Sequence, residues 1–480
     1  MKAFIRNFLK SDTVLVTLLI VAVFSIYLLT IKADFVSSVE RGRYALTRAI
    51  VEQHTFSIDK YKDFSYPDVS FKDGHYYSRF PAGMSVLSIP TALVATSTNI
   101  LDQKHIHFII MAYLGAVIVG LLYLLGRLYE FQKGTSLICA FAFAVSTLLF
   151  SFAGGYWSHI YSALFITLSL YFFTLFRKQK SKWFLLLLSI SYSASISIDF
   201  PNGLILSPLM IGVVLSILHS KKKVFSKIWA LFVTGIPIAL ISISIGLYNL
   251  TSFGSVVTIG QSAKTSLGTK LEKHIVPLGE WTSKGVFDDR RLFPGLFTQL
   301  FSVERGLLFF APILLLAFAG VGSLYKIDKY LTRILVSIII INLLFYSVWQ
   351  DYWGGWSFGP RYLIVSIPAL FLPLLSLVQK HIASAFFLFL FLVSTLFGTI
   401  INTVGAVAGI VLPCPCEGYV GLAYSPLLAF QTVMNGSINS FFYSSFFHNS
   451  MNQLEYTAFV FFLAILFLSA FIYIQSLERK

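Results

Sequence analysis

The chain has little charge and almost no cysteine. Charged residues make up 12% of its 480 positions and hydrophobic residues 56%, and the mean hydropathy is +0.78. This balance is typical of a polytopic membrane protein. The cysteines are Cys139, Cys414 and Cys416. Their odd number and spacing indicate neither a disulfide framework nor a metal site.

Several functional signatures are also missing. The sequence has no Walker loop, which argues against ATP-driven transport by this chain alone. It has no His-Glu-x-x-His pattern, which argues against an intramembrane zinc protease of that type. Charged residues inside the apolar runs are scarce, although a proton-coupled transporter normally needs them.

The formal net charge is +15. A basic chain can bind nucleic acid, but in a membrane protein lysine and arginine gather in short cytoplasmic loops. We therefore expect a lipid bilayer and no nucleic acid among the partners.

Apolar runs of roughly 20 residues, enough to cross a bilayer, recur along the sequence. We predict twelve spans, near residues 13–31, 105–125, 136–152, 157–176, 183–198, 203–218, 228–250, 306–325, 331–349, 362–378, 383–404 and 456–475. Segment 82–97 contains Gly83 and Pro90. We expect it to form an interfacial or re-entrant helix, with a thirteenth span as the alternative. The fold class is thus an all-α polytopic membrane protein with about 12–13 transmembrane helices.

The short basic loops fall on one side if the N-terminus is cytoplasmic. This orientation predicts a multi-pass protein of the cytoplasmic membrane with both termini inside. Residues 1–480 then form one membrane-embedded domain with three long outer loops, 32–104, 251–305 and 412–455. In the first loop, 41–53 has a helical pattern, and we expect an amphipathic helix along the membrane surface. Its apolar side would hold Tyr44, Leu46, Ile50 and Val51, opposite Arg43, Thr47 and Arg48.

The first outer loop also carries acidic candidates. Glu40 and Arg43 are three residues apart and can share a helix face. The alternative is a surface ion pair without a function. Asp34 lies nearer the end of the first span. His159, at the outer end of a later span, is either a pocket residue or a packing residue.

The turn 349–362 is the richest candidate site. Its glycines let the backbone approach a ligand closely, and Trp353 and Trp356 offer faces on which a sugar or a prenyl chain can stack. Arg361 can bind a phosphate through two N–H groups. An aromatic belt with a glycine turn is the alternative, but a belt alone does not need Asp351 and Arg361 in one short turn.

The order of these segments resembles a known family. An acidic residue precedes Arg43-Tyr44 by three positions. Gly74-His75-Tyr76-Tyr77-Ser78, Glu304-Arg305-Gly306 and Gly359-Pro360-Arg361-Tyr362 follow in turn. This order, from about Thr13 to Pro368, is similar to the GT-C superfamily of integral membrane glycosyltransferases, in particular the protein O-mannosyltransferase and lipid A aminoarabinose transferase group. The resemblance implies a GT-C-like bundle whose first outer loop carries juxtamembrane helices.

The resemblance also implies an activity. A polyprenyl-phosphate sugar would be the donor, and a lipid, glycan or protein the acceptor. Glu40 would serve as or position the general base, with Asp34 as the fallback. Arg43, Arg79 and Arg361 would bind the donor phosphate. The substrate pocket would hold Tyr44, Tyr76, Tyr77, His159, Asp351, Trp353 and Trp356. No cofactor is certain, and a divalent metal is left open.

Two other functions compete with this one. A flippase for lipid-linked sugars, or another transporter, needs functional charges within the spans and a path through the bundle. A structural membrane protein would not gather Glu40, Arg79 and Arg361 in one place. The glycosyltransferase hypothesis requires these three residues around one site on the outer face.

Overall fold

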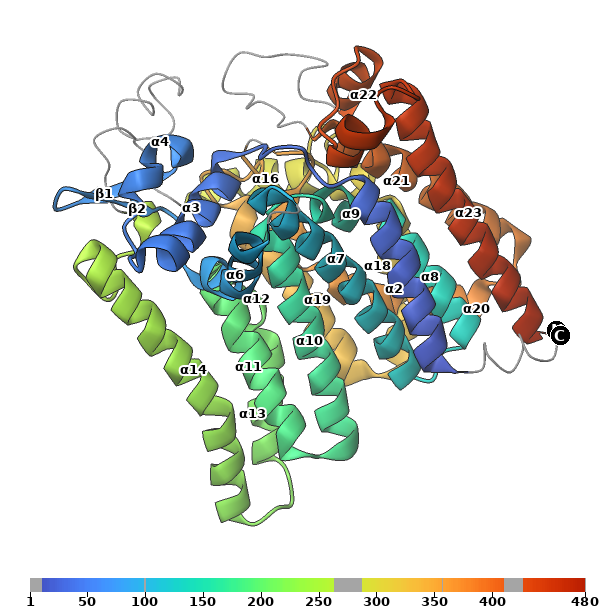
Figure 1. Ribbon diagram of the computed structural model, residues 1–480. Helices are drawn as coiled ribbons and strands as arrows, with labels where there is room; N and C mark the ends of the chain where they lie inside the picture. Colours follow the sequence, from blue (N-terminus) through green and yellow to red (C-terminus); the bar gives the residue numbers. More distant parts are fainter. Residues whose placement is uncertain (1–10, 99–100, 263–286, 356, 410–425, 480) are drawn as a thin grey trace.

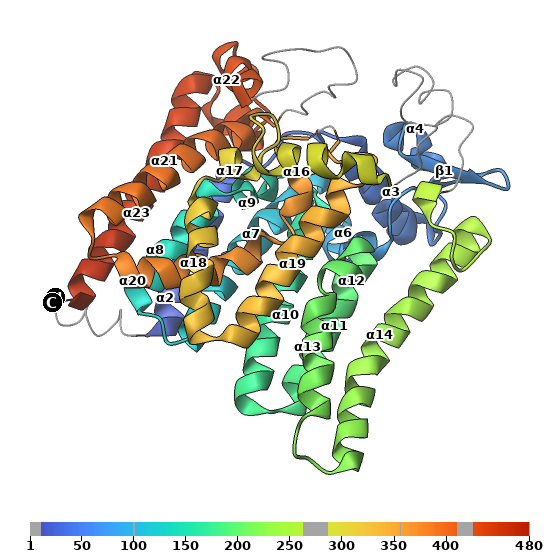
Figure 2. The same ribbon diagram turned by 180° about the vertical axis from the view of Figure 1, so that it is seen from behind.

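The structure is a computed structural model that describes residues 11–98, 101–262, 287–355, 357–409 and 426–479. Long helices run side by side in a bundle (Figure 1). One end of this bundle carries α3 (Ser38–Gln53), α16 (Leu292–Leu300) and α22 (Pro426–Met434), and we call it the α3 end. The described parts of all three predicted outer loops lie at this end (Figures 1 and 2).

Among the described residues, seven helices are long and apolar enough to cross a membrane. They are α2 (Asp12–Leu29), α7 (Gln103–Leu128), α10 (Ser158–Gln179), α14 (Val224–Phe253), α19 (Lys329–Ser347), α21 (Ala385–Ala408) and α23 (Gln453–Arg479). Four shorter apolar helices accompany them: α8 (Lys133–Ser146), α11 (Lys182–Ile198), α13 (Ser207–Leu218) and α18 (Ile313–Ile327). The predicted multi-pass helical bundle is confirmed.

Several predicted spans are broken into two elements. The run 136–152 divides into α8 and α9 (Leu148–Ala153), and the run 306–325 into α17 (Leu307–Phe310) and α18. The run 203–218 becomes the end of α12 (Pro201–Ile205) and α13, and 362–378 starts as 3-10 turns before α20 (Phe371–His381). Pro208 and Pro312 stand at two of these breaks. Proline fits the first turn of a helix, where its missing N–H group needs no partner, but it disrupts a helix interior.

Segment 82–97 forms two short helices, α5 (Gly83–Leu87) and α6 (Ile89–Ser97). A helix of nine residues is only about 14 Å long, so neither can cross a bilayer of about 30 Å. Both contact α3. A Cβ atom on Gly83 would lie 2.2 Å from the backbone oxygen of Ser197 in α11, so this glycine allows α5 to dock.

The first loop contains a small hairpin, the one strand pair of the described residues. β1 (Val69–Lys72) and β2 (His75–Ser78) are antiparallel, with Val69 opposite Ser78. Asp73 and Gly74 form the turn, both with positive φ. A separate hydrophobic cluster, which includes Tyr61, Tyr248 and Phe253, joins this loop to the end of α14.

The orientation of α3 corrects the sequence prediction. Arg43 and Thr47 were expected on the polar side of an amphipathic helix along the membrane surface, but both are buried. The Thr47 hydroxyl lies 3.2 Å from the Tyr156 hydroxyl and donates to the Ser85 carbonyl at 3.3 Å. Partners from distant segments therefore turn the polar side of α3 toward the bundle.

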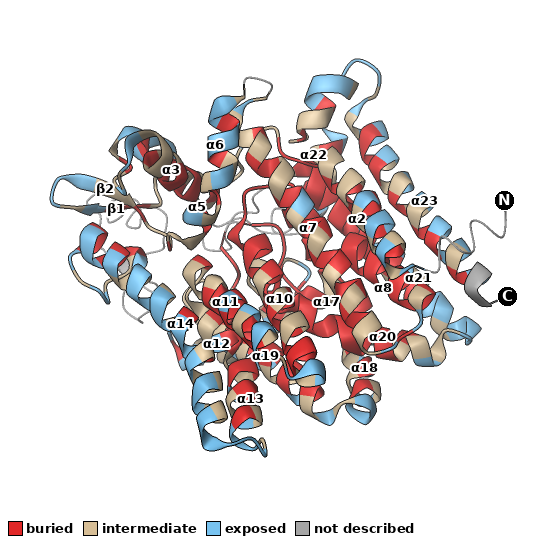
Figure 3. Ribbon diagram, turned by 60° about the horizontal axis from the view of Figure 1, so that its bottom comes forward, coloured by how far each residue is buried: buried red, intermediate tan, exposed pale blue. Residues whose placement is uncertain are grey.

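Burial differs strongly between the helices. The most apolar window of α10 is 78% buried and that of α14 only 11%. Figure 3 shows the same contrast, with red central helices and a pale blue α14 at the edge. Since the exposed side chains of α14 are mostly large and apolar, this helix presents its surface to lipid.

Candidate active site

Segments far apart in the sequence converge at the α3 end. They are α3, the end of α11 at Asp199, the residues just before α17, and the turn 351–361. Three arginines lie here: Arg43, Arg305 and Arg361. We call them the arginine cluster. Burial lowers the pKa of Arg43, and it lowers the pKa of Arg305 to about 9. The nearby positive charge of Arg361 lowers both pKa values further.

Arg43 is 3% exposed, and only part of its guanidinium group is hydrogen-bonded. Its Nη2 donates to Oδ1 of Asp199 at 2.9 Å, and its guanidinium carbon lies 4.7 Å from the centre of the Phe80 ring. Its Nε and Nη1 groups have no hydrogen-bond partner. A buried donor without an acceptor is unfavourable by about 1–3 kcal/mol, so this side of Arg43 is suited to an anion.

Arg361 resembles Arg43 in this respect. Its Nε has no hydrogen-bond partner, and its guanidinium carbon lies 5.9 Å from the Trp157 ring centre and 5.1 Å from that of Tyr362. A Cβ atom on Gly355 would lie 2.8 Å from the Arg361 Nη2. Gly355 has φ +63°. The glycine turn therefore lets the guanidinium lie directly against the backbone.

Arg305 was not among the predicted site residues. It is 2% exposed, its Nε donates to the Trp353 carbonyl at 3.0 Å, and its Nη1 donates to the Glu304 carbonyl at 3.1 Å. Trp353 itself is buried. The signal available in the sequence was the pair Glu304-Arg305 directly before an apolar run, because a charge at the mouth of a span is costly unless it has a role.

Two carboxylates lie beside the cluster. Asp199 ends α11 and accepts from Arg43 and, at 3.4 Å, from the Ser162 hydroxyl. Asp351 is different, because its Oδ1 is buried and has no hydrogen-bond partner. Burial raises the pKa of Asp351 to about 6, while the charges of Arg361 and Arg79 oppose this rise.

Glu40 is fully buried and bonded to the backbone. Its Oε2 accepts from the amides of Val36 at 2.9 Å and Ser37 at 3.1 Å, and its Oε1 accepts from the Tyr156 amide at 2.8 Å. Burial raises the pKa of Glu40 to about 7, and the hydrogen bonds and the charge of Lys32 oppose this rise. Glu40 thus completes a capping box with Ser37 and ties α3 to the turn before α10. The Ser-x-x-Glu pattern is a local signature that the sequence already contained.

Asp34, the alternative candidate for the general base, lies apart from the arginine cluster. The side chain of Asp34 is 71% exposed, and its Oδ1 is 3.1 Å from Nζ of Lys104. Asn439 also holds its backbone, accepting from the Asp34 amide at 3.1 Å. Asp34 is therefore part of an exposed ion pair near the segment before α23.

Arg79 lies at the edge of the cluster. Its Nη1 is 3.9 Å from Oδ1 of Asp68, whose Oδ2 accepts from the Ser38 hydroxyl at 2.6 Å. Its charge also acts on Asp351. The structure thus brings Arg43, Arg79, Asp351 and Arg361 into one region.

The predicted pocket residues fall into two groups. His159 is buried, with its ring centre 6.5 Å from that of Tyr362 and its Nδ1 without a partner. Tyr76 and Tyr77 lie in β2, where their rings contact Phe71 at 5.0 Å and Phe253 at 6.0 Å. They belong to the hairpin rather than to the arginine cluster. Trp356 lies outside the described residues.

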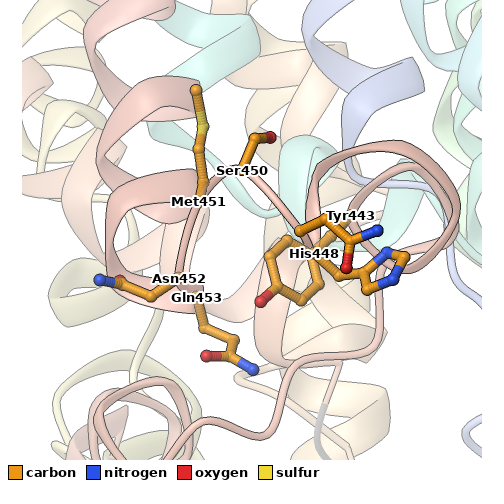
Figure 4. A pocket seen from close by; sticks show the side chains of 7 residues that line it. Tyr443, His448, Ser450, Met451, Asn452 and Gln453 are labelled. Atoms are coloured by element: carbon orange, nitrogen blue, oxygen red, sulfur yellow. The ribbon is translucent and has the colours of Figure 1, made fainter.

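Two surface hollows of the α3 end are separate from the cluster. One, of about 480 Å³, is lined by Tyr44, Arg48, Ala95, Thr96, Thr98, Leu101, Asp102 and Gln103. The other, of about 450 Å³, lies at the start of α23 and is lined by Tyr443, His448, Asn449, Ser450, Met451, Asn452 and Gln453 (Figure 4). No member of the arginine cluster lines either hollow.

Metal ligands do not gather in the part of the chain that the structure describes. There, no three side chains of His, Cys, Asp or Glu come together as a metal site.

Comparison with known proteins identifies the fold. No family model and no curated protein sequence matches the chain. Among solved structures, ArnT from Cupriavidus metallidurans bound to undecaprenyl phosphate matches 96% of this chain and 76% of its own, at 14% identity and a TM-score of 0.50. The oligosaccharyltransferase of Archaeoglobus fulgidus, in a complex with zinc and sulfate, matches 80% of this chain and 53% of its own, at 15% identity and a TM-score of 0.50.

A third match has a lipid-phosphate ligand. Oligosaccharyltransferase AglB from Archaeoglobus fulgidus, in complex with an inhibitory peptide and a dolichol-phosphate, matches 82% of this chain and 55% of its own, at 13% identity and a TM-score of 0.50. The chain spans about half the length of these oligosaccharyltransferases. Fold and site thus define a polytopic membrane protein with a buried arginine cluster at one end. Its fold is similar to that of ArnT and of these oligosaccharyltransferases, as expected from the resemblance to the GT-C superfamily.

Proposed function

We propose that this chain is a glycosyltransferase that moves a sugar from a polyprenyl-phosphate donor to an acceptor. The observation that carries the proposal is the arginine cluster, in which buried N–H groups of Arg43 and Arg361 have no acceptor. Like charges that lie close together are unfavourable when they are only partly neutralised, and a phosphate would add negative charge and satisfy these donors.

The same arginines suit the reaction. In sugar transfer the phosphate of the donor leaves as negative charge develops on its oxygen, and preorganised cations stabilise that charge. Arg43 and Arg361 would bind the phosphate directly, with Arg305 beside them and Arg79 at the edge. The acceptor hydroxyl or amine must also lose a proton to a carboxylate. Glu40 and Asp34 are the candidates that the sequence offers.

The surroundings suit a lipid carrier. α16 lies at the α3 end in contact with α19 (Figure 2) and exposes Phe293, Phe297 and Phe301. On its opposite face, Gln299 is buried and donates to the Ser347 hydroxyl at 3.1 Å. Phe301, the last of these phenylalanines, is four residues before Arg305, so a prenyl chain on their surface would bring its phosphate toward the cluster.

The orientation follows from the positive-inside rule. The α3 end would face outward from the cytoplasmic membrane, with both termini in the cytoplasm. The donor would be reached from the outer leaflet, and the acceptor would be a lipid, glycan or protein of the cell envelope.

The test measures donor binding and transfer on the same protein in nanodiscs. Binding of polyprenyl phosphate is titrated, and transfer is assayed with a panel of radiolabelled polyprenyl-phosphate hexoses and pentoses in native membranes. Arg361→Lys keeps the charge but loses the planar fork. We expect it to weaken binding about tenfold or more, the effect of losing about 1.5–3 kcal/mol.

Arg333→Lys is the matched control, because Arg333 is exposed on α19 and bonds to the Tyr325 hydroxyl at 3.1 Å. It should leave binding unchanged. Equal binding by both variants and wild type would contradict the phosphate site. Binding without transfer of any sugar, together with movement of the donor across the bilayer, would favour a flippase instead.

A further inference from the structure

The carboxylates near the arginine cluster differ in how they are satisfied. Glu40 accepts three backbone N–H groups. Asp199 is 2.9 Å from Arg43, and Asp68 accepts from Ser38. Asp351 alone among these four has a buried oxygen, Oδ1, with no hydrogen-bond donor.

Unpaired donors and an unpaired acceptor therefore lie in one region. The donors are N–H groups of Arg43 and Arg361, and the acceptor is Oδ1 of Asp351. Arg361 is close enough to act on Asp351 through its charge. A ligand that satisfies both kinds of group must combine a phosphate with a hydroxyl or an amine. The donor phosphate and the attacking acceptor together have this chemistry.

The turn holds Asp351 in place. The Asp351 carbonyl accepts from the Gly354 amide at 2.8 Å, and the Gly354 carbonyl accepts from the Ser357 hydroxyl at 3.2 Å. Gly354 and Gly355 have φ of +92° and +63°, so the chain reverses tightly between Asp351 and Arg361. The two side chains thus stay on one short turn, one as acceptor and the other as cation.

We propose that Asp351 is the general base of the transfer reaction and that Glu40 is a positioning residue. This inference rests on the proposed function. The acceptor oxygen or nitrogen attacks the anomeric carbon, and the bond between that carbon and the phosphate oxygen breaks. The electron pair leaves with the polyprenyl phosphate, and the acceptor proton moves to Oδ1 of Asp351.

The remaining carboxylates suit this task less well. Asp34 is exposed and pairs with Lys104. Glu40 uses both oxygens to hold α3 and the turn before α10. Asp199 already forms an ion pair with Arg43 at 2.9 Å.

The electrostatics support Asp351. Burial raises the pKa of Asp351 to about 6, and the charged groups that act on it are Arg361, Arg79 and Asp68. A carboxylate with a pKa near 6 is ionised at pH 7.5 and accepts a proton more readily than an ordinary aspartate. Transfer should therefore fall as pH drops below about 6.

The experiment separates loss of the base from loss of the site. Full-length wild type, Asp351→Asn and Glu40→Gln are compared in nanodiscs with a polyprenyl-phosphate sugar that wild type uses. Two nucleophiles are offered: water, read as donor hydrolysis, and azide, read as glycosyl azide. Water needs a base, whereas azide carries no proton to remove. Binding of unglycosylated polyprenyl phosphate reports whether the site is assembled.

We expect Asp351→Asn to lower hydrolysis at least 100-fold, the lower range for a general base, and to change azide transfer and polyprenyl-phosphate binding less than threefold. Glu40→Gln should lower hydrolysis and azide transfer in parallel. Asp351→Glu should restore part of the hydrolysis, with a shifted pH profile. Together these results would support the assignment.

Other outcomes overturn the assignment. If Asp351→Asn loses azide transfer and binding as well, while Asp351→Glu restores nothing, Asp351 only supports the fold. If Glu40→Gln instead loses hydrolysis alone and keeps azide transfer, Glu40 is the base. If wild type turns over no donor with either nucleophile, the proposed function fails and this inference fails with it.

Discussion

The turn beside Arg361 provides a test that separates backbone strain from ligand binding. Gly355 has φ +63°, within the left-handed region that an alanine adopts at a cost of about 1 kcal/mol. A Cβ atom here would lie 2.8 Å from the Arg361 Nη2. Gly355→Ala therefore strains the backbone only slightly but must push the guanidinium away.

The displacement can be worked from the contact distances. An ordinary van der Waals contact begins at 3.4 Å, so the Arg361 Nη2 must retreat by about 0.6 Å from 2.8 Å. A charge-assisted hydrogen bond of about 2.8 Å would lengthen to about 3.4 Å, beyond its favourable range. Loss of one such bond weakens binding by about 1.5–3 kcal/mol, which is roughly 10- to 100-fold in Kd.

Gly354→Ala is the matched control on the same turn. The φ of Gly354, +92°, is less accessible to alanine than that of Gly355. The nearest atom to a Cβ on Gly354 would be 3.6 Å away, and the nearest atom of Arg361 would be Cγ at 3.9 Å. Gly354→Ala should thus lower the Tm at least as much as Gly355→Ala.

The readouts are the Tm and polyprenyl-phosphate binding in nanodiscs. Gly355→Ala should weaken binding more than tenfold and Gly354→Ala less than threefold. Equal loss in both variants, or unchanged binding in Gly355→Ala, would refute the argument that the position of Arg361 controls phosphate binding.

Three further results are expected. Because burial raises the pKa of Glu40 to about 7 from its ordinary 4.5, the folded protein retains a proton that the unfolded chain releases. Wild type should therefore lose stability as pH rises from about 5 to 7, and a Tm series should show that Glu40→Gln removes this slope. Arg305→Gln should weaken polyprenyl-phosphate binding about tenfold in the same titration, since one cation beside the phosphate is lost; unchanged affinity would exclude Arg305 from the site. Gly83→Ala places a Cβ 2.2 Å from the Ser197 backbone oxygen and should destabilise the protein by about 1–3 kcal/mol, whereas Gly235→Ala, with no atom within 4 Å, should leave the Tm unchanged or raised.

The apolar runs alone determined that the protein is a multi-pass helical bundle. A bilayer cannot hydrogen-bond the backbone, so a long apolar run within it must form a helix. The order of short polar motifs, from Glu40 and Arg43 to Arg361, further indicated a GT-C-like bundle, and the fold is indeed similar to that of ArnT and AglB.

Tertiary structure decided what each polar residue contacts. The sequence places Arg43 on the polar side of a helix, where solvent is the default partner. Only the fold brings in Asp199 and Phe80, which make burial of that side favourable. Likewise, Glu40 is three residues from Arg43 in sequence but bonds to the Tyr156 amide, because α3 docks on the turn before α10.

The arginine cluster likewise depends on tertiary contacts that the sequence does not show. Local sequence marks Arg305 and Arg361 as charges at the ends of apolar runs, but it cannot show that Arg43 joins them from the other end of the chain. Such proximity depends on the packing of helices between them, and the free energy of each buried charge depends on those neighbours. The sequence therefore determined the multi-pass helical class, and the tertiary structure decided which polar residues face one another.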